Sequence, residues 1–210
     1  MIPAHEALER LREGNRRFAS DRGSRPIILG GLPGPDPAQQ RPFAIILGCS
    51  DSRVPVEIVF DQGLGDLFVI RVAGNIVAPS QLGSVEFAAT QYGSRLVVVL
   101  GHSHCGAVRA TLEELRRPAA SQSRSLQSIV DRIRPSVEGL LIAESKEDPG
   151  ALVRRAVRAN VHQSVNQLKH GSAIIEQLVA EAGLIVVGAE YSVETGLVDF
   201  FDGIGPGGLP

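Results

Sequence analysis

Tryptophan is absent from this chain of 210 residues, and only two cysteines, Cys49 and Cys105, are present. Two cysteines exclude a disulfide-rich scaffold, but they leave open one bridge between them or a pair of buried thiols. No apolar run approaches the length of a transmembrane helix, so we expect no membrane span. An excess of basic charge is also missing, since the net charge is −2 at pH 7, which argues against nucleic acid as a partner.

The residues that are present have the composition of an ordinary folded protein. Hydrophobic residues make up 43% and charged residues 21%, and the length suits one α/β domain with a sizeable core. The first residues carry no apolar signal-peptide core, so we expect a cytoplasmic protein, or a periplasmic or secreted one if a leader has been removed. The chain shows no internal repeat.

Short apolar runs alternate with helical patterns along the chain. Four runs predict buried strands, at Phe43–Leu47, Leu67–Val72, Leu96–Leu100 and Leu184–Ala189, and Tyr191–Phe200 predicts a turn into a short edge strand. Strands that alternate with helices are typical of a mostly parallel sheet covered on both faces. We therefore expect an α/β fold with four mostly parallel strands, an antiparallel edge strand and flanking helices.

The segments between the runs carry the period of amphipathic helices. Predicted helices cover His5–Ser20, Val54–Gln62, Ser80–Tyr92, Gly106–Arg117, Leu126–Leu141, Leu152–Leu168 and Ser172–Ala182. Ser80 and Ser172 are expected to cap the helices that they begin. Pro135 is expected to kink the helix around it.

Three parts are expected along the chain. Residues 1–41 predict an N-terminal helical arm, because the stretch Asp21–Arg41 after the first helix is rich in glycine and proline. We expect this arm to pack on a partner subunit. Residues 42–202 predict the α/β domain, and residues 203–210 a loose tail.

Metal-ligating side chains follow two of the predicted strands. Cys49 comes shortly after one apolar run, and His102 and Cys105 come shortly after another. The carboxyl ends of neighbouring parallel strands meet at one edge of the sheet, where open α/β sheets hold their sites. Two thiolates and one imidazole leave the fourth position of tetrahedral Zn²⁺ open, which is the ligand count of a catalytic zinc. We therefore predict one zinc ion per chain.

His104 is the rival ligand, because it adjoins Cys105. On an extended turn it points the other way from His102, and we therefore favour His102. Cys105 lies at the start of a predicted helix, where the positive end of the helix dipole favours a thiolate.

Asp51 and Arg53 form a second feature beside Cys49. On a turn, the guanidinium can hold the carboxylate through two hydrogen bonds. Asp51 can then accept a hydrogen bond from a zinc-bound hydroxide, or it can take the open zinc position and switch the site off. The alternative is a pair that only braces the loop.

Together these motifs resemble the β-class carbonic anhydrases of the plant-type subgroup. The matching stretches are Cys-Ser-Asp-Ser-Arg-Val at 49–54, Arg-Val-Ala-Gly-Asn at 71–75 and Gly-His-Ser-His-Cys-Gly at 101–106. The resemblance runs from about Gln40 to Tyr191. It implies zinc on Cys49, His102 and Cys105, with Asp51 and Arg53 as the catalytic pair.

The resemblance further implies the reversible hydration of CO₂ to bicarbonate and a proton, by attack of a zinc-bound hydroxide. It implies a homodimer as the smallest active unit, which can pair into a homotetramer. It also implies a substrate pocket near the dimer interface, and the residues that correspond by position are Gln40, Phe68, Ala73, Phe87 and Gly106. Periodicity alone leaves open that the apolar members of this set are ordinary core.

One departure from the family pattern concerns regulation. A regulated subgroup binds inhibitory bicarbonate through a tryptophan, an arginine and a tyrosine. Arg71 and Tyr191 stand at the matching positions, but Ile46 replaces the tryptophan. We therefore expect no such bicarbonate site, and an Asp51 that stays paired with Arg53.

Two other functions remain open. A hydrolase of carbonyl sulfide or carbon disulfide would keep the same zinc ligands, although Gln40 favours CO₂. The other alternative is a non-enzymatic zinc or redox-binding protein with Cys49 and Cys105 as a thiol switch. The Asp51–Arg53 pair counts against it, because a switch does not need that pair. His162 and His170 are expected on exposed helix faces.

Overall fold

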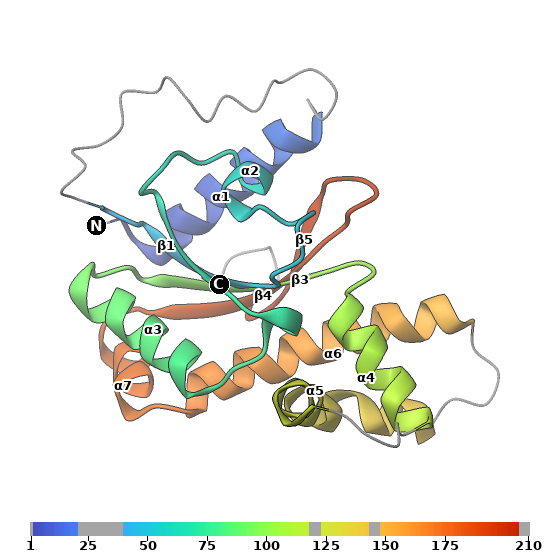
Figure 1. The fold of residues 1–210 in the computed structure, drawn as a ribbon. Coiled ribbons are helices and arrows are strands. Elements are labelled where there is room, and N and C mark those ends of the chain that lie inside the picture. Colours follow the sequence, from blue (N-terminus) through green and yellow to red (C-terminus); the bar gives the residue numbers. More distant parts are fainter. Residues whose placement is uncertain (1, 21–39, 118–122, 143–147, 206–210) are drawn as a thin grey trace.

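The computed structural model describes residues 2–20, 40–117, 123–142 and 148–205 (Figure 1). Its centre is a five-stranded sheet with the order β2-β1-β3-β4-β5. The strands are β1 (Ala44–Gly48), β2 (Leu67–Arg71), β3 (Leu96–His102), β4 (Ile185–Tyr191) and β5 (Val198–Asp202). The first four are parallel and β5 is antiparallel to β4, so the predicted fold class is confirmed.

The two central strands are buried along their whole length. Every residue of β1 and β3 is buried, which fits their unbroken runs of isoleucine, leucine and valine. β3 continues two residues beyond its expected end at Leu100, because Gly101 and His102 pair with Glu190 and Tyr191 of β4. His102 is therefore the last residue of a central strand.

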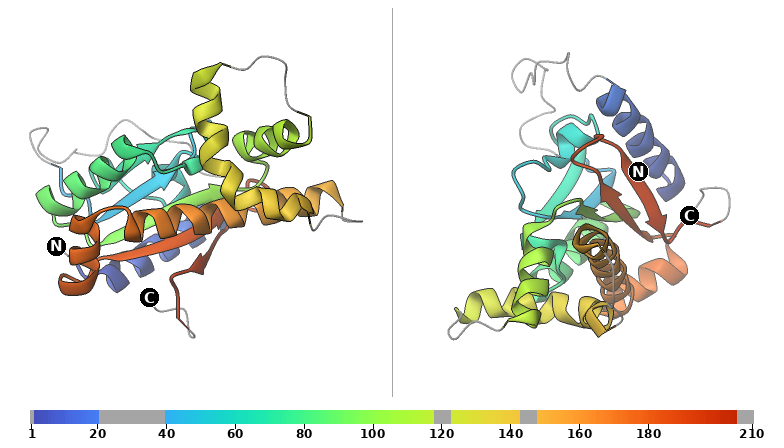
Figure 2. Two further views of the ribbon diagram at one scale, coloured as in Figure 1. Left: turned by 90° about the horizontal axis from the view of Figure 1, so that it is seen from below. Right: turned by 90° about the vertical axis from the view of Figure 1, so that its right-hand side faces the viewer.

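Helices cover both faces of this sheet (Figures 1 and 2). They are α1 (Ala4–Ser20), α2 (Val56–Val59), α3 (Pro79–Gln91), α4 (Gly106–Arg116), α5 (Arg124–Ile142), α6 (Pro149–His170) and α7 (Ala173–Glu181), with a short 3₁₀ helix, η1 (Ala73–Asn75). Helices α1 and α2 pack on one face. Helices α3, α6 and α7 pack on the other. A third apolar cluster joins α4, α5 and α6 around the two cysteines.

Helix α1 packs on the sheet of its own chain. Leu8 and Leu11 are fully buried there. Asn15 fixes the helix in place, since its Nδ2 donates to the carbonyls of Val59 and Gly196. Gly14 permits the close approach, because a Cβ at this position would lie 1.8 Å from the Phe60 carbonyl oxygen. The expected contact of the arm with a partner stays a prediction, and its segment 21–39 lies outside the described residues.

The structure tests the predicted helix caps and the predicted bend at Pro135. The prediction that Ser80 caps α3 is wrong, because Pro79 occupies the first turn and Ala78 is the N-cap residue. The cap at Ser172 is confirmed, since its hydroxyl accepts from the Ile175 N–H. Helix α5 holds Pro135 in its interior and is bent in both views (Figures 1 and 2). Among the described helices, none is long and apolar enough to cross a membrane.

Candidate metal centre

Between β1 and β3, the order in which the chain adds strands to the sheet reverses, and the carboxyl ends of these two strands lie at that point. β1 connects to β2 on one side, and β3 connects to β4 on the other. Ligand sites of open α/β sheets lie at such a point. Cys49 directly follows β1, His102 ends β3, and Cys105 is the N-cap residue of α4.

These three side chains converge. The two Sγ atoms and an imidazole nitrogen all lie within 4.8 Å of one another, and all three residues are buried. Both cysteines are free thiols, so the alternative of a disulfide bridge is not realised. The expected grouping of Cys49, His102 and Cys105 is confirmed.

The His102 ring has a nitrogen prepared to bind a cation. Its Nδ1 lies 2.9 Å from the Ser103 carbonyl oxygen, which can only accept, so Nδ1 carries the proton and donates. Nε2 is then a free lone pair. This atom is buried without a hydrogen-bond partner, an arrangement that is costly unless something binds there. The donor set therefore fits a metal ion.

The two thiols are electrostatically coupled. The Cys105 thiol and the Gly74 N–H both donate to the Cys49 sulfur, which lowers the pKa of Cys49 well below its ordinary value. The Gly74 nitrogen lies 3.3 Å from the Cys49 sulfur. The neighbouring Cys49 and burial raise the pKa of Cys105. Without a cation, the pair therefore keeps one proton, and a divalent cation would replace it.

Gly74 is the residue that brings this N–H close to the sulfur. Its φ is +72°, in the left-handed region, and a Cβ here would lie 2.8 Å from Cδ1 of Ile133. A side chain at this position would therefore be strained by the left-handed φ and would force the end of the Ile133 side chain to shift. The Arg-Val-Ala-Gly-Asn motif thus contributes backbone to the site.

Asp51 and Arg53 form the expected pair beside the cluster. Arg53 Nε donates to Asp51 Oδ1 at 2.9 Å and Arg53 Nη2 donates to Oδ2 at 2.8 Å. These bonds hold the pKa of Asp51 well below its usual range. Asp51 Oδ2 also lies 3.9 Å from His102 Nε2, so an ionised carboxylate stands next to the candidate metal ligands.

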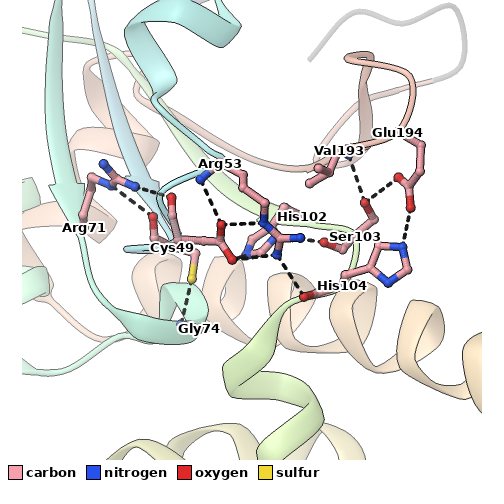
Figure 3. Close-up of polar contacts among 10 residues, drawn as sticks. Cys49, Arg53, Arg71, Gly74, His102, Ser103, His104, Val193 and Glu194 are labelled. Carbon is pink, nitrogen blue, oxygen red and sulfur yellow. Dashed lines mark hydrogen bonds and ion pairs between the residues drawn. The ribbon is translucent and has the colours of Figure 1, made fainter.

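Arg71 has a role here that sequence analysis missed. Its Nε donates to the Cys49 carbonyl at 3.1 Å and its Nη2 donates to the Asp51 carbonyl at 2.6 Å (Figure 3). Arg71 thereby braces the turn that carries one ligand and the acidic residue. Ile46, at the position of the absent tryptophan, is fully buried in the core. The absence of a regulatory bicarbonate site stays a prediction.

His104 turns away from the cluster. Its backbone is left-handed, with φ +56°, and its side chain is 67% exposed. Its Nε2 pairs with Glu194 Oε1, and Ser103 Oγ donates to Glu194 Oε2 at 2.7 Å (Figure 3). The structure therefore brings His102, and not His104, to the two cysteines. Glu194 was missed, because the sequence gives no sign that the β4–β5 turn returns to this loop.

The remaining candidate residues fall into two groups. Ala73 and Gly106 directly adjoin Gly74 and Cys105, at the metal centre. The others belong to an aromatic cluster, defined here as Gln40, Phe68, Phe87 and Tyr92. Gln40 Nε2 donates to the Tyr92 hydroxyl at 2.8 Å, and the Phe68 and Phe87 ring centroids lie 6.2 Å apart.

This aromatic cluster lies away from the cysteines of the same chain. Gln40 precedes the amino end of β1, whereas Cys49 follows its carboxyl end. Phe87 is 50% exposed, so it is not ordinary core. His162 and His170 are exposed as predicted, at 61% and 73%, and contact Asp202 and Glu176.

Comparisons with known proteins agree with this geometry. The family model described as carbonic anhydrase matches residues 44–198. The chain is 38% identical over 199 residues to Carbonic anhydrase 2 of Mycobacterium tuberculosis, covering 95% of this chain and 93% of that protein. It is 37% identical to the carbonic anhydrase of Mycolicibacterium smegmatis, covering 95% and 94%. The structure of the β-carbonic anhydrase CafA of Aspergillus fumigatus superposes with a TM-score of 0.72 and 26% identity, covering 96% and 91%.

Proposed function

This chain belongs to the β-class carbonic anhydrases, and from that premise we propose that it binds one Zn²⁺ per chain and reversibly hydrates CO₂ to bicarbonate and a proton. The observation that carries the proposal is the buried cluster of Cys49, His102 and Cys105, with an unpartnered Nε2. Two thiolates and one imidazole suit zinc and leave one coordination position for water. When bound, the ion is a Lewis acid that lowers the pKa of a coordinated water from about 15.7 towards neutrality.

Asp51 orients the attacking water. An ionised carboxylate only accepts hydrogen bonds, so Asp51 Oδ2 accepts a hydrogen bond from the incoming water and directs a lone pair of that water away from itself. Arg53 keeps the carboxylate ionised through the two bonds described above. The geometry supports this role because Oδ2 stands 3.9 Å from His102 Nε2, at the edge of the metal site.

Arg71 holds the geometry of this turn. Its two bonds to the Cys49 and Asp51 carbonyls tie a metal ligand and the orienting carboxylate to the edge strand β2. Positioning groups of this kind allow a site to keep its shape between turnovers. The carboxylate is therefore already placed when CO₂ arrives.

Stopped-flow CO₂ hydration tests this function. We expect the zinc-loaded protein to accelerate hydration, a chelator-stripped sample to lose that acceleration, and added Zn²⁺ to restore it. Carbonyl sulfide and carbon disulfide are run in parallel. A zinc-loaded protein that hydrolyses either sulfide and leaves CO₂ untouched would favour the hydrolase, and a protein inert towards all three would favour the thiol switch.

The proposed active unit is a homodimer, in which the aromatic cluster of one chain forms a wall of the partner's substrate pocket. The cluster supports this because it lies at the end of β1 opposite Cys49 and cannot line the pocket of its own chain. Phe87 is half exposed and packs against the rings of Phe68 and Tyr92, so the cluster offers a continuous apolar surface to a partner.

Phe87→Glu is expected to convert the dimer into monomers and to lower CO₂ hydration. A charge buried at an apolar interface is costly unless it is paired, so the dimer should dissociate. Size-exclusion chromatography with light scattering gives the mass. Leu126→Glu is the control, since Leu126 is an exposed apolar residue of α5 outside the cluster, at 58%. A Phe87→Glu protein that stays dimeric and active would contradict this assignment.

A further inference from the structure

A residue of the β4–β5 turn holds the loop between two of the metal ligands. We infer that Glu194 is a positioning residue for the metal centre, acting through Ser103 and His104. The inference rests on the proposed function only in that the cluster must bind a metal. It adds a second support to the site, on the side opposite the one that Arg71 braces.

Glu194 contacts the loop through both carboxylate oxygens (Figure 3). Ser103 Oγ donates to Oε2 at 2.7 Å, and His104 Nε2 pairs with Oε1. Ser192 Oγ, from the same turn, donates to Oε2 at 3.0 Å. The Ser103 hydroxyl in turn accepts from the Val193 N–H at 2.9 Å. Each of the two loop residues between His102 and Cys105 is therefore bound to the turn.

The loop benefits from this support because part of its backbone is in a sparsely populated conformation. His104 adopts φ +56°, in the left-handed region, which few residues other than glycine take, although histidine takes it more often than most. Such strain persists where neighbouring contacts fix it. Without the bond to Glu194, His104 is free to relax, and a change in its φ would displace the next residue, Cys105, from the cluster.

The same loop also contacts the catalytic pair. Arg53 Nη2 lies 3.4 Å from the His104 carbonyl oxygen while it donates to Asp51. A shift of the His104 peptide would therefore move the guanidinium as well. Glu194 thus acts on both the third metal ligand and the group that holds Asp51.

The ion pair between Glu194 and His104 is exposed and contributes little to the free energy of unfolding. The Glu194 side chain is 52% exposed and that of His104 67%. Exposed pairs are screened by solvent and are worth little to folding. Loss of Glu194 should therefore weaken the metal site while leaving the fold intact. Removal of a group that holds metal ligands in place commonly lowers the metal affinity by about 10–100-fold.

The chain offers a matched control. Glu176 and His170 form another exposed pair, with side chains 52% and 73% exposed and atoms 3.8 Å apart. This pair joins α6 and α7. Glu176→Ala removes the same kind of carboxylate from the same kind of histidine without touching the loop.

Zinc release into a chromogenic chelator tests the inference on full-length protein. We expect Glu194→Ala to lose zinc about 10-fold faster than wild type or Glu176→Ala. Its melting temperature should match that of Glu176→Ala. Glu194→Gln keeps an acceptor for Ser103, so its zinc release rate should lie between those of wild type and Glu194→Ala. Release from Glu194→Ala at the wild-type rate would overturn the inference, while zinc binding by wild type would leave the proposed function standing.

A second pair of variants tests the strain directly. In the Glu194→Ala background, His104→Gly should recover part of the lost zinc retention, because glycine adopts a left-handed φ without strain. His104→Ala removes the same ring and should recover nothing. Equal retention by the two double variants would overturn the inference. A wild-type protein that takes up no zinc would overturn both the inference and the proposed function.

Discussion

Replacing Cys105 with alanine is expected to abolish both metal binding and CO₂ hydration. Cys105 supplies one of two thiolates, and its removal leaves two ligands from separate strands, too few to hold zinc in a tetrahedral site. Loss of a group that merely supports a ligand costs about 10–100-fold, so loss of the ligand itself should lower the hydration rate by at least about 100-fold. Elemental analysis and stopped-flow kinetics on one preparation measure both quantities.

Val108→Ala is the control for the cavity that this substitution leaves. Val108 lies one turn further along α4 and, like Cys105, is about 1% exposed. It contacts the same apolar cluster and binds no metal. Val108→Ala should therefore keep stoichiometric zinc and most of the activity. A Cys105→Ala protein that holds zinc and turns over at the wild-type rate would show that the metal sits elsewhere.

Replacing Asp51 with asparagine is expected to separate metal binding from turnover. The amide would keep the shape of the side chain but lose the charge that Arg53 and the water recognise. We expect stoichiometric zinc with kcat reduced about 100-fold, because misplacing a reacting group by about 1 Å can cost about that much. Circular dichroism confirms folding, and stopped-flow kinetics gives kcat separately from KM.

The Arg17–Asp61 pair provides a matched control for this variant. Arg17 Nε lies 2.6 Å from Asp61 Oδ2, and the two side chains are 47% and 29% exposed, against 47% and 18% for Arg53 and Asp51. Asp61 has a left-handed φ that asparagine tolerates well. Asp61→Asn should therefore leave turnover unchanged. Full activity in Asp51→Asn would assign Asp51 to bracing of the loop alone.

The sequence predicts the metal ligands because strand ends are easy to recognise. The apolar runs before Cys49 and His102 become neighbouring parallel strands, and topology then brings their carboxyl ends together. Two thiols and an imidazole at one edge of the sheet already indicate a site for a metal such as zinc. The choice of His102 over His104 also follows from local geometry, although the left-handed φ that turns His104 outward is visible only in the structure.

Contacts over long sequence separations are what the sequence does not reveal. Glu194 lies 91 residues from Ser103, and nothing in a turn of Glu-Thr-Gly indicates which loop it faces. Arg71 matches a family position, yet its bonds to two backbone carbonyls depend on the register of β2 beside β1. The placement of Gln40 at the far end of β1 likewise depends on the direction of the strand, so a pocket residue implied by resemblance lies remote from the candidate metal site of its own chain.

The proposed function depends on Cys49, His102 and Cys105 holding one metal ion together. X-ray absorption at the zinc edge of the purified protein measures this directly, because sulfur and nitrogen scatter at different distances. We predict two sulfur atoms at about 2.3 Å and nitrogen or oxygen atoms at about 2.0–2.1 Å. A first shell of nitrogen and oxygen alone, or a shell with four sulfur atoms, would contradict this set of ligands.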